Sequence, residues 1–103
     1  MTDGGGSEAP DWEREFPPER LRRLAGSSSA EYLPVTTPVF YVGVPKGQPW
    51  EALHARTIIS FGGICLVETM DCLDDWYMGQ PAPDGSIHCW GRYGPLEDAI
   101  AGL

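Results

Sequence analysis

Apolar and polar residues alternate along the middle of the chain, a pattern that is typical of β-strands with one buried face. The clearest run covers residues 53–61, where every second position is held by Leu53, Ala55, Thr57, Ile59 and Phe61. This period of two predicts a strand. A short helix over residues 49–55 is the alternative, because Pro49 suits the first turn of a helix.

Four other segments also have the composition of strands. Residues 38–44 are β-branched and aromatic and end at the turn-forming Pro45-Lys46-Gly47. Residues 64–68 follow Gly62-Gly63, which permits a two-residue hairpin, so we expect them to return antiparallel to the first run. Residues 74–79 and 86–93 form a last pair, joined by a loop that contains Asp84-Gly85.

Helix signals lie at the two ends of the chain. Asp11 can cap a helix, but Pro17-Pro18 stops any helix that begins there. A second short helix is predicted over 18–25, ended by Gly26. A terminal helix is predicted over 95–101, because a proline opens it and acidic residues lie in its first turn.

Together these elements predict an α+β fold: an antiparallel β-meander of four to five strands, with short N-terminal helices and a C-terminal helix packed on one face. Residues 1–10 are rich in Gly, Ser and acidic residues and predict a disordered N-terminal tail. Residues 11–103 are then a single domain, since separate hydrophobic cores rarely form below about 100 residues each.

Charge narrows the classes of function. Fifteen Asp and Glu against seven Lys and Arg give a formal net charge of −8. This balance argues against binding to nucleic acids or anionic membranes, because both need clustered Lys and Arg. The N-terminal residues lack the basic and apolar regions of a signal peptide, and the chain has no apolar run long enough to span a membrane. We therefore expect a cytoplasmic protein.

The candidate metal ligands and nucleophiles are two histidines, His54 and His88, and three cysteines, Cys65, Cys72 and Cys89. Zinc ligands usually come in pairs two to four residues apart, and the cysteines are spaced more widely. We therefore expect no metal, no cofactor and three free thiols, with Cys65 and Cys89 buried as small apolar side chains. No sequence typical of cysteine or serine enzymes surrounds these residues, so we expect no catalysis.

The segment from residue 68 to residue 84 is the most distinctive part of the chain, with five acidic residues and no Lys or Arg. Met and aromatic residues are interleaved with the acids. Such a mixture suits a surface that binds a basic protein, because aromatic side chains supply contact energy and carboxylates supply attraction and specificity. The predicted partner-binding residues are Glu68, Asp71, Asp74, Asp75, Trp76, Asp84 and Trp90. The alternative is that the tryptophans belong to the core and the acids only solvate a loop.

Three sequence blocks in the C-terminal half carry a resemblance: DDWYMG at 74–79, PDGSI at 83–87 and CWGRYGPLEDAI at 89–100. Over residues 39–103 the chain resembles small acidic actinobacterial immunity-type proteins from toxin–antitoxin or polymorphic-toxin loci. The resemblance implies a non-catalytic inhibitor that neutralises a basic toxin domain by tight binding. The alternatives are a small accessory or regulatory interaction domain without a toxin, and a small enzyme that uses Cys and His. A concentrated acidic face would favour the first reading, and evenly spread charge the second.

Overall fold

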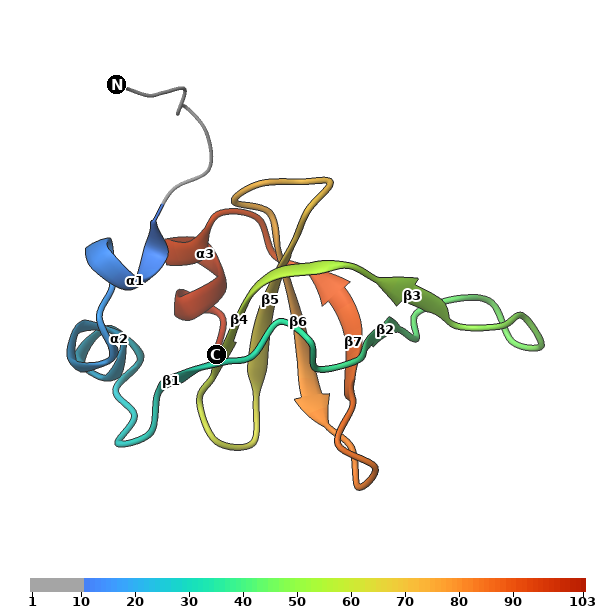
Figure 1. Ribbon diagram of the computed structural model, residues 1–103, viewed down its shortest axis with the longest axis horizontal. Coiled ribbons are helices and arrows are strands. Elements are labelled where there is room, and N and C mark those ends of the chain that lie inside the picture. Colours follow the sequence, from blue (N-terminus) through green and yellow to red (C-terminus); the bar gives the residue numbers. More distant parts are fainter. Residues whose placement is uncertain (1–10) are drawn as a thin grey trace.

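The computed structural model describes residues 11–103, and the predicted disorder of residues 1–10 lies outside that range (Figure 1). The described chain is an α+β fold in which short helices cover one side of a curled sheet. The helices are α1 (Trp12–Glu15), α2 (Pro18–Ala25) and α3 (Leu96–Ala101). The strands are β1 (Glu31–Leu33), β2 (Val39–Tyr41), β3 (Glu51–Leu53), β4 (Ala55–Ser60), β5 (Cys65–Thr69), β6 (Trp76–Pro81) and β7 (Ile87–Arg92).

The strands form one sheet in the order β1-β4-β5-β6-β7-β2-β3. From β4 to β7 the sheet is the predicted antiparallel meander. The prediction of four to five purely antiparallel strands is nevertheless too simple, because the sheet has seven strands and β2 pairs parallel to β7. One residue, His54, separates β3 at one end of the order from β4 near the other end. The two ends of the sheet therefore have to approach each other, which explains its curl.

The alternating run at 53–61 was predicted to be one strand, but in the structure it is divided at His54 between two strands. Its first part belongs to β3, which pairs with β2, and its second part is β4, which pairs with β1 and β5. The alternative helix over 49–55 is wrong, because residues 51–53 are extended. The period of two persists through the change of partner, so the sequence pattern alone does not reveal it. Strand β1 carries no such pattern and was not foreseen.

Two hydrophobic clusters lie on opposite faces of the sheet. The larger cluster lies under the helices and contains Trp12, Phe16, Leu21, Ala30, Ile59, Phe61, Leu66, Trp76, Met78, Leu96, Ala99 and Ile100. The smaller cluster lies inside the curl and contains Val39, Ile58, Cys65, Val67, Ile87 and Cys89. Strand β5 is buried at every position because it contributes to both clusters. Burial on both faces accounts for the apolar run Cys65-Leu66-Val67 in its first part.

Helix ends and turns follow the local sequence closely. The Asp11 side chain accepts a hydrogen bond from the backbone N of Arg14 and caps α1, which ends before Pro17-Pro18. Gly26 adopts a left-handed conformation (φ +65°) and closes α2. At the hairpin between β4 and β5, Gly62 has φ +88°, a conformation that favours glycine. These helices and turns confirm the predictions made for them.

Candidate functional site

The seven predicted partner-binding residues do not lie on one surface. Glu68 and Trp76 are fully buried, each with 0% of its surface exposed. Neither side chain can touch a partner in this structure, so both are corrected from contact residues to internal supports. The interpretation of Trp76 as a core residue is the right one, since it packs edge-on against Trp12 with ring centroids 5.7 Å apart.

The Glu68 carboxylate is the centre of a buried polar network. Its Oε1 accepts hydrogen bonds from the indole Nε1 of Trp12 (2.9 Å), Nη1 of Arg56 (2.6 Å) and Oγ1 of Thr57 (2.9 Å). Its Oε2 accepts one from the backbone N of Asp74 (2.7 Å). Arg56 also supplies the opposite charge that a buried carboxylate needs. One carboxylate thus joins α1, β4 and the connection between β5 and β6.

That connection, residues 70–75, is held at both ends and is called here the 70–75 loop. At its start, the backbone N of Met70 donates to the carbonyl oxygen of His54. At its end, Oδ1 of Asp74 accepts from Nε1 of Trp76 (3.1 Å) and from the backbone N of Leu96 (3.0 Å). Asp74 has φ +53°, a conformation that is uncommon for a residue with a side chain. These contacts fix Asp74 in place, so its carboxylate serves the fold.

The outward surface of the 70–75 loop is mixed apolar and acidic. Met70 is 62% exposed and Leu73 is 48% exposed, and the Asp71 side chain between them is also exposed. The Asp75 carboxylate lies 3.1 Å from Nη1 of Arg92, and both partners are partly open to solvent. The exposed apolar side chains of this loop are therefore Met70 and Leu73, whereas the predicted Trp76 next to it is buried.

Trp90 lies on β7 and is 40% exposed, so it stays available to a partner. Its indole Nε1 donates to the hydroxyl of Tyr93, which is equally exposed (3.2 Å). The backbone N of Tyr93 in turn donates to the carbonyl of Trp76, the first residue after the 70–75 loop. The Trp90–Tyr93 pair is therefore hydrogen-bonded to the first residue of β6, the strand that follows the 70–75 loop.

Asp84 lies in the hairpin between β6 and β7, at the other end of strand β6 from the 70–75 loop (Figure 1). The length of β6 separates it from the 70–75 loop, roughly 20 Å at the usual rise of a strand. Its Oδ1 accepts hydrogen bonds from the backbone N and the hydroxyl of Ser86, and these bonds lower the pKa of the Asp84 carboxyl. The structure thus gives Asp84 a role in the turn and does not bring it to the same surface as the other acids.

An aromatic cluster formed by Phe40 of β2, Trp50 just before β3 and His88 of β7 escaped the sequence analysis. The ring centroids of Trp50 and His88 are 4.7 Å apart, and those of Phe40 and Trp50 are 6.5 Å apart. Trp50 is 52% exposed. Nε2 of His88 is 3.2 Å from Oγ of Ser86, which donates to Asp84. The parallel pairing of β2 with β7 assembles this cluster, and no local signal in the sequence predicts that pairing.

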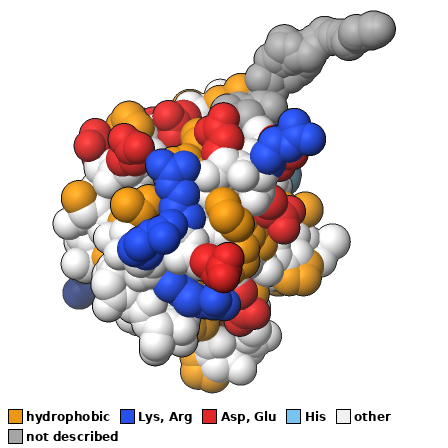
Figure 2. Space-filling view, turned by 90° about the vertical axis from the view of Figure 1, so that its left-hand side faces the viewer, with side chains coloured by type: hydrophobic (Ala, Val, Ile, Leu, Met, Phe, Trp, Pro, Cys, Tyr) orange, Lys and Arg blue, Asp and Glu red, His pale blue; other side chains and the backbone are white. Residues whose placement is uncertain are grey.

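Charged residues on the side of the molecule that carries α1 and α2 are of both signs. Figure 2 looks onto this side and shows Lys and Arg side chains intermixed with Asp and Glu. The basic residues of the two helices are Arg14, Arg20, Arg22 and Arg23. This side is therefore not the concentrated acidic face that an immunity-type protein would present.

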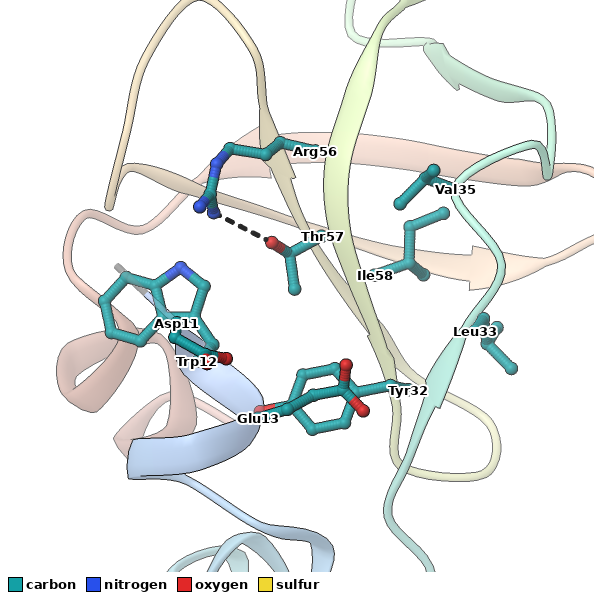
Figure 3. A pocket seen from close by; sticks show the side chains of 9 residues that line it. All are labelled: Asp11, Trp12, Glu13, Tyr32, Leu33, Val35, Arg56, Thr57 and Ile58. Atoms are coloured by element: carbon teal, nitrogen blue, oxygen red, sulfur yellow. Dashed lines mark hydrogen bonds between the residues drawn. The ribbon is translucent and has the colours of Figure 1, made fainter. Parts of the chain in front are cut away.

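A groove of about 370 Å³ lies between α1 and the strands β1 and β4 (Figure 3). Its lining residues are Asp11, Trp12, Glu13, Tyr32, Leu33, Val35, Arg56, Thr57 and Ile58. The Tyr32 hydroxyl donates to the carbonyl of Phe16 (2.8 Å). Burial raises the pKa of Tyr32, and the negative charges of Glu13 and Asp11 raise it further. The groove is open to solvent. It adjoins the Glu68 network, because Arg56 and Thr57 line the groove and also donate hydrogen bonds to Glu68.

Two of the three cysteines are buried, and Cys72 is partly exposed. Cys65 and Cys89 are buried inside the curl, as expected, on either side of Gly79 in neighbouring strands. Burial raises the pKa of Cys65 and raises that of Cys89 to about 12, which leaves both thiols protonated at neutral pH. Among residues 11–103, no group of three or more His, Cys, Asp or Glu side chains is arranged to hold a metal ion.

Neither a protein-family model, nor a curated protein, nor a solved structure matches the chain. Within the described residues, no helix is long and apolar enough to cross a membrane.

Proposed function

We propose that the protein is a non-catalytic, cytoplasmic binding protein that contacts a basic protein partner through the 70–75 loop. In the reading suggested by the resemblance, that partner is a toxin domain and the contact neutralises it. One observation carries the proposal: a loop held in place by buried hydrogen bonds presents two large apolar side chains, Met70 and Leu73, to solvent.

Exposed apolar side chains on a fixed loop lose little entropy when a partner covers them, so their burial goes mainly into affinity. Met adapts to irregular surfaces, and Leu adds further apolar contact. The exposed Asp71 between them attracts a basic surface over a longer range and raises the rate of association. A toxin that cleaves nucleic acid would have such a surface, because it must neutralise phosphates.

The test is direct binding to the protein encoded beside this one, measured by biolayer interferometry with the full chain. Replacing Met70 and Leu73 together by Ser is expected to speed dissociation about tenfold or more, as loss of anchor contacts does. The matched control is Leu24→Ser, which removes another exposed apolar side chain, on α2, that belongs neither to the loop nor to a proposed contact.

Charge is tested separately with Asp71→Asn and Asp84→Asn, which each remove one carboxylate from opposite ends of the sheet. The first is expected to slow association and weaken its salt dependence, and the second is expected to change neither. Equal effects of the two variants, or unchanged dissociation of the Met70/Leu73 variant, would contradict the proposal.

A second candidate is an accessory or regulatory interaction domain without a toxin. The mixed charge around α1 and α2 favours it, since an inhibitor of a strongly basic enzyme would gain from a uniformly acidic face (Figure 2). The two candidates differ in cells: co-expression of an inhibitor rescues growth from the neighbouring protein's toxicity, and co-expression of an accessory domain does not.

A further inference from the structure

The groove between α1 and the strands β1 and β4 has two chemically different walls. Asp11 and Glu13 place carboxylates on the α1 side, whereas Leu33 and Val35 form an apolar side (Figure 3). Val35 is half exposed, so the apolar wall is reachable from solvent. A groove that is acidic on one side and apolar on the other suits a side chain with a cationic end and an aliphatic stem.

The electrostatic balance of the groove is negative although Arg56 lines it. The guanidinium of Arg56 lies 2.6 Å from the buried Glu68 carboxylate, which offsets its charge. The negative charges of the Asp11 and Glu13 carboxylates therefore set the net charge of the groove lining. Burial is the main cause that raises the pKa of Tyr32, and the charges of Glu13 and Asp11 raise it further.

We propose that this groove receives an arginine side chain of the basic partner, which makes it a second contact beside the 70–75 loop. The inference rests on the proposed function and names the group that is recognised. The guanidinium meets Asp11 and Glu13, and its three-carbon stem lies along Leu33 and Val35. Arginine fits better than lysine, because its planar fork can bond carboxylates in pairs and can stack on the ring of Tyr32.

The position of the groove supports a shared partner. Arg56 at the groove wall and the backbone N of Asp74 in the 70–75 loop bind the two oxygens of the same Glu68 carboxylate. The groove and the loop are therefore neighbours at one end of the sheet. A partner seated on Met70 and Leu73 has the groove within reach of one side chain.

The test uses the isolated full-length chain and needs no partner protein. The ¹⁵N-labelled protein is titrated with N-acetyl-arginine N-methylamide, and the indole N–H signal of Trp12 is followed by NMR. Trp12 lines the groove and donates to Glu68, so its signal reports on this place. The expected result is a saturable shift of Trp12 with little change at the exposed indoles of Trp50 and Trp90. N-acetyl-citrulline N-methylamide, which has nearly the same shape without the charge, is expected to give no saturable shift.

The variant Asp11→Asn with Glu13→Gln removes both charges and keeps a side chain that can cap α1. It is expected to weaken binding of the arginine derivative at least about fivefold, as loss of charge-assisted hydrogen bonds does. The matched control, Glu31→Gln, removes an exposed carboxylate of β1 that does not line the groove and is expected to leave binding unchanged.

Equal shifts with the citrulline derivative, an absent shift at Trp12, or undiminished binding by the double variant would overturn the arginine site. Such a result leaves the loop proposal standing if the Met70/Leu73 variant still loses the partner. Conversely, a saturable arginine shift with no effect of the loop variant would reject the loop and keep the groove.

Discussion

Replacing Glu68 by Gln tests whether the buried network holds the 70–75 loop. The change keeps the size of the side chain but removes its charge and gives one end two N–H donors. In the best orientation the amide oxygen replaces Oε1 and faces Trp12, Arg56 and Thr57. The amide nitrogen then faces the backbone N–H of Asp74, so two donors stand where a 2.7 Å hydrogen bond existed.

The structure allows an approximate magnitude. Loss of a hydrogen bond to a charged group costs about 1.5–3 kcal/mol. Arg56 also loses its buried counter-charge, and breaking a buried pair in this way costs about 3–5 kcal/mol. Because the Arg56 side chain is 21% exposed, water can partly replace Glu68, and we expect the lower end of that range. The expected loss of unfolding free energy is therefore about 3 kcal/mol.

Urea denaturation followed by tryptophan fluorescence measures this loss. With a urea m-value of about 1.5 kcal/mol per molar, the midpoint is expected to fall by about 2 M. The matched control is Asp75→Asn in the same loop, which removes one partner of a partly exposed ion pair and is expected to cost less than about 1 kcal/mol. If Glu68→Gln costs no more than Asp75→Asn, the network does not hold the loop, and the basis of the proposed binding site is lost.

Three further outcomes follow from the packing. Trp76→Ala is expected to cost about 3–5 kcal/mol of unfolding free energy, because Trp76 is fully buried. Trp90→Ala, at an exposed position, is expected to cost less than about 1 kcal/mol. Equal losses of stability in thermal melts would contradict the assignment of Trp76 to the core and Trp90 to the surface. Gly79→Ala is expected to lower the urea midpoint, since its Cβ would lie 2.5 Å from the carbonyl oxygen of His88, and Gly63→Ala, with open space around it, serves as the control. In the folded protein near pH 8, a thiol reagent is expected to react rapidly with Cys72 alone, and after denaturation with all three cysteines. The reason is that burial and raised pKa values keep the Cys65 and Cys89 thiols protonated. Rapid reaction of all three thiols in the folded protein would refute this.

Local structure was largely predictable because it depends on neighbours in sequence. Helix α2 begins at a proline and ends at Gly26, and the hairpins turn at Gly62 and Gly85, where positive φ is needed. The antiparallel run from β4 to β7 joins consecutive strands through short connections, so the alternating pattern and the turn residues were enough to predict it.

The sequence by itself determined that residues 11–103 contain the elements of an α+β domain, and it pointed to residues 68–84 as unusual. Only the tertiary structure decided which of their side chains are exposed and which are buried. Alternation shows that one side of a strand is buried, but not which helix or strand covers that side. The sequence therefore left Trp76 open between a contact residue and a core residue, and the packing of Trp12 against it decides for the core. Glu68 was read as a surface acid because its partners Trp12 and Arg56 are distant in sequence, and only folding brings them within hydrogen-bond distance of its carboxylate.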